Sequence, residues 1–308
     1  MALFEKALKA TVMTTELFIR ADVSKKVLYE CLEIAREFER TYSAYKEDSL
    51  LSKINQASGV RSVTCSDEEL EIFKIALEMA EISKGAFDPT IGALTQGLYG
   101  FGTQNPKIPN KTELLNSKTL VNYRFMQIDK NEVYLKRKGM KLDLGAIGKG
   151  FVADKIIKHL LNKNATRALV SVGGEICSFG KKYNIAIRDP FSGNNIGVIK
   201  SSKRVLSIST SGDYERFIGS KENHHILDNL SAKSNHYYSS VTIIKNGADA
   251  TTLDGVATIV FNASRNKLTE IAQKFGVAII AITPHKEILF ENFSNIDIES
   301  FELHPFKS

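Results

Sequence analysis

The sequence predicts an α+β protein: a single compact domain in which helices pack on a mixed, largely antiparallel β-sheet. Helical patterns dominate the first third of the chain. Short apolar strands separated by turn-forming residues dominate residues 168–244. The two patterns do not alternate as they would in a doubly wound parallel sheet. With 308 residues, the chain can bury a large core without disulfides. We therefore expect one domain over residues 1–308.

Five helices are predicted from apolar residues spaced three and four apart. The helix over 24–45 places Leu28, Cys31 and Leu32 on one buried stripe. Ser66 and Glu69 have the spacing of a capping box, which predicts that a second helix begins there; we expect it to end at Gly85. The other helices are expected to open at the glycine-rich segment 145–150 and to cover 250–260 and 264–275.

The strands are predicted from short apolar runs bounded by turn-forming residues such as Asp189-Pro190. The expected strands cover residues 168–172, 184–188, 196–200, 205–210, 214–218, 238–244, 277–282 and 288–291. Segment 102–111, which contains Pro106 and Pro109, is expected to be a surface loop inside the domain.

Composition argues against several classes of protein. Cys31, Cys65 and Cys177 are odd in number, widely spaced and lack a Cys-x-x-Cys pair, which argues against a disulfide framework and a zinc site. The 41 Lys and Arg residues exceed the 35 Asp and Glu residues only slightly, and no basic run or nucleic-acid-binding signature is present. We expect no nucleic-acid partner.

The sequence also predicts no transmembrane segment. The longest apolar run, residues 277–282, is far shorter than a membrane span. Charged residues, among them Glu5, Lys9 and Glu16, interrupt the stretch in which a signal peptide would be apolar. As written, the chain is expected to be cytoplasmic; if a leader was removed, it would be periplasmic or membrane-anchored.

The glycine-rich segment 145–150 is a candidate anion site. It lacks the spacing of a Walker A loop and of a dinucleotide-binding turn. A glycine-rich entry to a helix nevertheless exposes backbone N–H groups that favour anions, and Lys149 adds a positive charge, with Asp143 just before the segment. The alternative is that the glycines only start the helix tightly and that Lys149 is solvated.

Asp254 and Thr258 are candidate metal ligands. They lie at positions i and i+4 of an apolar helix, so their oxygens project from one face. Hard oxygen ligands of this kind suit Mg²⁺, which needs few protein ligands and binds substrate phosphates. The alternative is an aspartate paired with a lysine and a threonine bonded to its own helix.

His225 is a candidate general base. None of the six histidines forms a His-x-x-x-His pattern, so a zinc hydrolase is not expected. Asp228 follows His225 closely and could orient its imidazole. The alternative is a strand-edge histidine without a chemical role.

Nine blocks follow one another in a specific order. They cover residues 13–15, 42–55, 85–92, 99–102, 142–150, 172–176, 210–214, 225–228 and 254–258. Taken together, the blocks resemble the ApbE family of FAD:protein FMN transferases. Three positions depart from the family pattern: Thr14 replaces a glycine, Tyr99 a tryptophan and Asn229 a proline.

The resemblance implies a flavin site and a Mg²⁺ site. The implied flavin-binding residues are Met13, Ala86, Phe87, Asp88, Asp143, Lys149, His225 and Ile226. The implied Mg²⁺ ligands are the carbonyl of Ala146 and the side chains of Asp254 and Thr258. We expect His225 and Asp254 to be the catalytic residues.

The expected activity is Mg²⁺-dependent transfer of FMN from FAD to a Thr or Ser hydroxyl of an acceptor flavoprotein, with release of AMP. FAD and the acceptor are the expected partners. Two alternatives use the same residues: a Mg²⁺-dependent FAD pyrophosphatase that yields FMN and AMP, and a flavin-binding protein without catalysis.

Overall fold

The computed structural model describes residues 4–304 and 306. The chain forms two compact units, each assembled from separate segments. The first unit comprises residues 1–37, 149–212 and 237–308, and the second comprises residues 38–148 and 213–236. That residues 1–308 act as a single domain remains a prediction.

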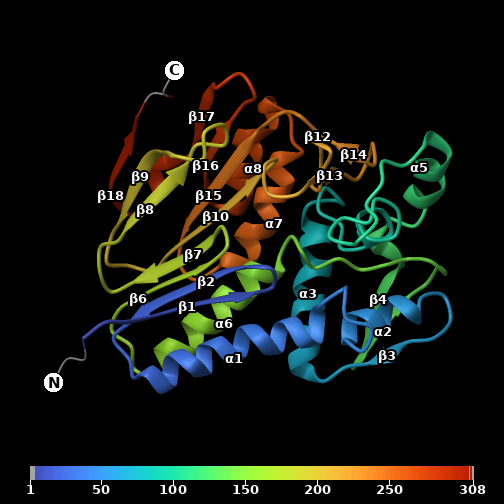
Figure 1. Cartoon of the computed structure of the whole chain (residues 1–308), viewed down its shortest axis with the longest axis horizontal. Coiled ribbons are helices and arrows are strands. Elements are labelled where there is room, and N and C mark those ends of the chain that lie inside the picture. Colours follow the sequence, from blue (N-terminus) through green and yellow to red (C-terminus); the bar gives the residue numbers. More distant parts are fainter. Residues whose placement is uncertain (1–3, 305, 307–308) are drawn as a thin grey trace. The chain divides into compact units, whose positions relative to one another are not determined.

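An eight-stranded sheet is the framework of the first unit (Figure 1). Its strands, in spatial order, are β1 (Lys6–Val12), β2 (Thr15–Ala21), β6 (Ala168–Val172), β7 (Glu175–Phe179), β10 (Leu206–Gly212), β15 (Ser240–Asn246), β16 (Ala278–Ile282) and β17 (Ile288–Glu291). All neighbouring pairs are antiparallel. The prediction of an α+β fold with a largely antiparallel sheet is therefore confirmed.

Helices pack against this sheet. They are the first part of α1 (Lys25–Tyr42), α6 (Gly148–Asn162), α7 (Ala250–Phe261) and α8 (Leu268–Phe275), which follows the short 3-10 helix Arg265–Lys267. Helix α7 contacts β10 and β15, and α8 contacts β16 (Figure 1). Most of α7 is buried, because most of its residues are apolar. Gly276 ends α8 in the left-handed conformation, with φ of 62°.

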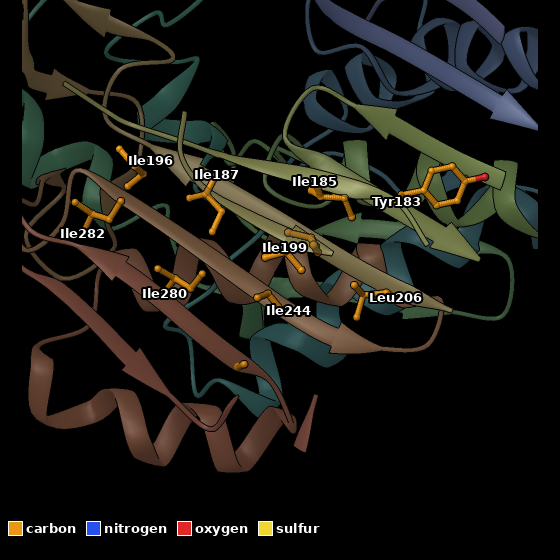
Figure 2. Close-up of a cluster of buried hydrophobic side chains, with 11 residues drawn as sticks. Tyr183, Ile185, Ile187, Ile196, Ile199, Leu206, Ile244, Ile280 and Ile282 are labelled. Atoms are coloured by element: carbon orange, nitrogen blue, oxygen red, sulfur yellow. The ribbon is translucent and has the colours of Figure 1, made fainter. Parts of the chain in front are cut away.

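A three-stranded sheet completes the first unit. Strand β9 (Asn195–Ser201) lies between β18 (Ile298–Leu303) and β8 (Asn184–Arg188). Alternate residues of β8 and β9, such as Ile185 and Ile199, pack with Ile244 and Ile280 of the large sheet (Figure 2). This alternation with period two buries one face of the small sheet in the core.

The second unit contains short helices and small sheets. Its helices after α1 are α2 (Leu50–Gln56), α3 (Asp67–Ile82), α4 (Gly92–Thr95), α5 (Lys111–Lys118) and the 3-10 helix Tyr123–Phe125. Its sheets are β3 (Val63–Thr64) with β5 (Glu132–Leu135) and β4 (Met126–Asp129), β11 (Phe217–Ile218) with β12 (Ser220–His224), and β13 (Leu227–Asp228) with β14 (Lys233–Ser234). Among the described residues, no helix is long and apolar enough to cross a membrane.

Several predicted boundaries need correction. The capping box of Ser66 and Glu69 is present, but α3 ends at Ile82 rather than Gly85. Helix α6 begins at Gly148 rather than Gly145, because residues 144–147 form a turn with the carbonyl of Leu144 as acceptor. The strand predicted over 214–218 is reduced to β11, and the hairpin of β1 and β2 was not predicted.

Candidate active site

Helices α6 and α7 meet closely at their N-terminal ends in the first unit. A Cβ atom on Gly150 would lie 2.1 Å from the carbonyl oxygen of Ala250, so only glycine permits this approach of two backbones. The amide of Gly150 donates to Oδ2 of Asp254 at 3.2 Å. The carboxylate of Asp254 thus accepts one of the N–H groups that the first turn of α6 leaves without a helical partner.

Lys149 lies between two buried carboxylates. Its Nζ is 3.0 Å from Oδ1 and 3.3 Å from Oδ2 of Asp254, and 3.4 Å from Oε1 of Glu175. The side chain of Lys149 is 29% exposed, against 2% for Asp254 and 0% for Glu175. Lys149 is therefore not a solvated surface residue. Pairing of Asp254 with a lysine was the alternative interpretation of that aspartate, and the structure contains this pair.

Burial and neighbouring charges shift the pKa values of Lys149 and Glu175. Burial disfavours the ammonium of Lys149, but the carboxylates of Asp254 and Glu175 outweigh burial and raise the pKa of Lys149. Burial raises the pKa of Glu175 well above that of an ordinary glutamate, and the nearby charge of Asp254 adds to the effect. One ammonium thus lies between two carboxyl groups that compete for it.

Two tight turns border the Lys149 side chain. Gly173, with φ of 64°, links β6 to β7 and places Glu175 at the start of β7. A Cβ atom on Gly173 would lie 3.4 Å from Cδ of Lys149 and 2.8 Å from Oγ1 of Thr15. Met13 and Thr14 form the β1–β2 turn with φ values of 51° and 61°. Thr14 therefore adopts a conformation that favours the glycine of the family pattern.

Thr258 lies one helical turn after Asp254 on α7 and is partly exposed. One carboxylate and one hydroxyl on the same helix form a small set of hard oxygen donors, which suits Mg²⁺. Among the described residues, no group of three or more His, Cys, Asp or Glu side chains is placed to hold a metal ion. Ala146 belongs to the second unit, where it lies in the turn before α6.

In the second unit, Asp88 and Asp143 are held by their own loops. The carboxylate of Asp88 accepts from the amide and hydroxyl of Thr90 at 2.8 and 2.6 Å, and from the amide of Tyr123 at 2.8 Å. Burial raises the pKa of Asp88 despite these bonds. Asp143 accepts from the hydroxyl of Thr95 at 2.5 Å and from the amide of Gly145 at 2.8 Å. Both carboxylates therefore shape the loops that bear them.

His225 has a defined tautomer. Its Nδ1 lies 3.2 Å from the carbonyl oxygen of Arg216, and the amide of His225 donates to the same oxygen at 3.0 Å. Because a carbonyl only accepts, Nδ1 carries the hydrogen and Nε2 carries the lone pair. Asp228, expected to orient the imidazole, accepts from the amides of Leu230 and Ser231 at 2.9 and 3.3 Å. The carbonyl of Arg216 thus has the orienting role that the sequence suggested for Asp228.

The preceding residue, His224, is buried and plays a different part. Its Nε2 donates to the carbonyl of Asn235 at 2.8 Å, and its Nδ1 accepts from the amide of Ile226 at 3.3 Å. Burial lowers the pKa of His224 from 6.5 to about 4. His224 is therefore a neutral structural residue that anchors the segment bearing His225 and Ile226.

Asn229 connects this segment to a second one. Its Nδ2 donates to the carbonyls of Gly85 at 2.9 Å and Ala86 at 3.2 Å. Asn229 occupies the position where the family pattern has a proline, a residue that has no side-chain donor. The side chain of Asn229 thus joins two segments that the sequence assigned to flavin binding.

The predicted site residues divide between the two units. Met13, Lys149, Asp254 and Thr258 lie in the first, and Ala86, Phe87, Asp88, Asp143, Ala146, His225 and Ile226 lie in the second. The structure brings Lys149 and Asp254 into contact, and it links Ala86 to the His225 segment through Asn229.

A comparison with protein families decides the relationship. The model of the ApbE family matches residues 10–281. The chain belongs to the ApbE family. This result confirms the resemblance inferred from the ordered blocks.

ApbE relatives and structures agree with this assignment. A FAD:protein FMN transferase of Treponema pallidum is 32% identical over 285 residues, which cover 85% of this chain and 78% of that protein. The crystal structure of the ApbE protein from Thermotoga maritima has a TM-score of 0.87 and 27% identity, and covers 96% of this chain and 99% of that one. The flavin transferase ApbE from Vibrio cholerae shares the fold, with a TM-score of 0.79 at 23% identity over 93% of this chain and 96% of that chain.

Sequence reasoning missed the role of Glu175 in this ApbE fold. The residue lay inside one of the quoted blocks, but it received no function. A signal was present, since a carboxylate at the start of an otherwise apolar strand requires a buried partner. The carbonyl of Arg216 could not be found in this way, because every residue carries the same backbone group.

Proposed function

We propose that the chain transfers the FMN portion of FAD to the hydroxyl of a Thr or Ser in an acceptor flavoprotein and releases AMP. Membership of the ApbE family and the relatives named FAD:protein FMN transferase support this activity. The observation that carries the proposal is the pair of Lys149 and Asp254 at the N-terminus of α6. It combines a cation, a carboxylate and helix amides, which together suit a metal-bound diphosphate.

The metal of this reaction is proposed to be Mg²⁺. Asp254 and Thr258 would hold it with the carbonyl of Ala146. Among the described residues, the buried carboxylate of Asp254 contacts Lys149 and the amide of Gly150, and this hard oxygen donor fits a divalent cation. When bound, Mg²⁺ supplies positive charge that neutralises the diphosphate and the departing AMP.

The protein groups have separate roles in the proposed reaction. The acceptor hydroxyl oxygen attacks the phosphorus of the FMN half, and the bond from that phosphorus to the bridging oxygen breaks, so the bridging oxygen leaves with AMP. Nε2 of His225 accepts the hydroxyl proton, because the Arg216 carbonyl keeps the hydrogen on Nδ1. Lys149 stabilises the phosphate charge.

We assign the flavin end of FAD to the residues that the family resemblance implies: Met13, Ala86, Phe87, Asp88, Asp143 and Ile226. Phe87 and Ile226 are buried, whereas Ala86 is exposed. The loops of Asp88 and Asp143 are fixed by their own hydrogen bonds, so their amides and carbonyls are pre-organised.

The decisive experiment follows the fate of FMN. The chain is incubated with FAD, Mg²⁺ and a candidate acceptor, and mass spectrometry measures FMN on the acceptor while chromatography measures free FMN and AMP. We expect equal amounts of AMP and FMN-bearing acceptor, and no product when the acceptor Thr is replaced by Val. Free FMN with AMP in the presence of a proven acceptor would identify a pyrophosphatase instead. Bound FAD that remains intact would identify a flavin-binding protein.

A further inference from the structure

Glu175 is a buried acidic residue of the first unit. Its side chain is 0% exposed, and among the described residues neither carboxylate oxygen makes a hydrogen bond of ordinary geometry, although the Ser209 hydroxyl lies near it. The ammonium of Lys149, 3.4 Å from Oε1, is its charge partner. A buried carboxylate left in this state is costly, so its retention in the fold calls for a reason.

Lys149 occupies the oxygens that a metal would need. Its Nζ lies within 3.3 Å of both oxygens of Asp254, and the amide of Gly150 also donates to Oδ2. A divalent cation bound to Asp254 would lie close to this ammonium, so repulsion between the two positive charges favours withdrawal of Lys149 from the carboxylate. Withdrawal into a site without a counter-charge would leave a partly buried cation unpaired, which is unfavourable.

We propose that Glu175 is a positioning residue that takes over Lys149 when Asp254 binds a divalent cation. This inference rests on the proposed function and concerns the exchange of cations within it. Before the metal binds, the ammonium of Lys149 balances the negative charge of Asp254. Because Glu175 contacts the same Nζ at 3.4 Å, only a small shift of the ammonium transfers it from one carboxylate to the other. Glu175 thus lowers the cost of freeing Asp254.

The proposal separates Glu175 from a simple source of negative charge. A simple charge, or a direct ligand, would attract the metal whether or not Lys149 is present. A residue that acts through Lys149 would lose its effect once Lys149 is removed. A double-mutant cycle measures this difference, because it isolates the coupling of the two side chains.

The experiment measures Mn²⁺ binding to the whole chain by electron paramagnetic resonance, without FAD, in parent, Glu175→Gln, Lys149→Met and the double variant. We expect Glu175→Gln to weaken Mn²⁺ binding by about tenfold and Lys149→Met to tighten it by about tenfold, as couplings between adjacent charges allow. The double variant should match Lys149→Met within about twofold, because no lysine remains to be held.

Lys245→Met is the matched control. Lys245 pairs with Asp249 at 2.6 Å, and its side chain has the same exposed fraction as Lys149, 29%. This control should leave Mn²⁺ affinity unchanged. Near-UV circular dichroism verifies that every variant is folded. Glu175→Gln keeps the size of the side chain, so it removes the charge without leaving a cavity.

Two results would overturn the inference. The first is an unchanged Mn²⁺ affinity in folded Glu175→Gln. The second is the same loss from Glu175→Gln in the Lys149→Met background, which would make Glu175 a ligand or a plain charge. If the parent binds no Mn²⁺, or if Asp254→Asn binds it as well as the parent does, the proposed metal site fails and the inference falls with it.

Discussion

Asp154 and Asp254 cap each other's helices. Asp154, on α6, accepts from the amides of Ala250 and Thr251 at 2.9 and 2.8 Å and from the Thr251 hydroxyl at 2.6 Å, at the start of α7. Asp254, on α7, accepts from the amide of Gly150 at the start of α6. The two differ in one respect: Asp154 is engaged by helix donors, whereas Asp254 shares its oxygens with Lys149.

Asp154→Ala should therefore reduce stability rather than chemistry. Loss of this cap leaves the first amides of α7 without their acceptor, which should cost about 2 kcal/mol of the free energy of unfolding. Urea denaturation measures the loss. Asp154→Asn, which keeps one acceptor oxygen, should lose less. Equal stability of parent and Asp154→Ala would show that Asp154 is dispensable as a cap.

Asp254→Asn should reduce catalysis rather than stability. The amide still accepts from Gly150, but it no longer supplies the charge that the proposed metal site requires. We expect a folded protein with normal flavin affinity and transfer slowed by more than about a hundredfold. Asp154→Asn is the matched control, measured in the same assay. Activity within about threefold of the parent, under about 0.7 kcal/mol, would contradict the assignment of Asp254.

His225→Ala tests the proposed base. Transfer at saturating FAD should slow by about 10²–10⁴-fold, the usual contribution of general base catalysis, while FAD and Mn²⁺ affinities stay near those of the parent. The parent's rate should fall as the pH is lowered, because protonation removes the lone pair from Nε2. Single-turnover measurements across pH 5 to 9 check both expectations, with the exposed His285→Ala as control. A variant that binds FAD weakly but turns over at the parent's saturated rate would assign His225 to flavin binding alone.

His224 should make stability depend on pH in a defined window. Its pKa is lowered from 6.5 to about 4 in the folded protein, so the unfolded chain binds more protons between these values. The contribution of neutral His224 is therefore complete above about pH 6.5 and is lost as the pH falls toward 4, by up to about 3 kcal/mol. The charge of His236, whose ring centroid lies 5.7 Å from that of His224, adds to the lowering of the His224 pKa.

The measurement for His224 is the difference between parent and His224→Gln. Urea denaturation at several pH values between 4 and 8 gives the free energy of unfolding of each protein. Subtracting one free energy from the other cancels the titration of the other groups. Stability of the parent should fall more steeply on acidification than that of the variant. Parallel curves would show that His224 titrates normally in the fold.

Asn229→Ala should weaken FAD binding with little change in the saturated rate. The substitution removes the donor to the carbonyls of Gly85 and Ala86 and frees the two segments to move apart. We expect a rise in KM of about fivefold, comparable to the net value of one or two hydrogen bonds. Asn229→Asp, which cannot donate, should be at least as weak. If kcat falls while KM stays constant, Asn229 would instead act on the reacting groups.

Local patterns explain which parts of the fold could be predicted. The capping box at Ser66 and strands β6, β8 and β17 were found at or near their observed bounds, because their signals lie within a few residues of sequence. The β1–β2 hairpin was missed. Its turn contains Met13 and Thr14 rather than the glycine or asparagine that normally marks such a turn, so no local signal was present.

Pairings between distant residues explain what remained hidden in the site. Asp254 and Thr258 were predicted as site residues from their helical spacing, and Lys149 from its glycine-rich surroundings. Their arrangement was not: the contact of Lys149 with Asp254 joins residues 105 positions apart, and Glu175 approaches from a third element. The orienting carbonyl of Arg216 has no side-chain signature at all. Such contacts follow from the tertiary fold, which local patterns do not encode.

The ion pair between Lys149 and Asp254 also bears on how the protein is made. In a zinc finger, the chain cannot fold until the ion binds, because no other group of the chain takes the place of the metal among its ligands. Here Lys149, a residue of the same chain, neutralises Asp254 without any bound ion. Newly synthesised chains can therefore reach their final structure while the supply of divalent ions is low. With the proposed Mg²⁺ requirement, scarcity of the ion would limit the rate of catalysis without reducing the number of folded molecules.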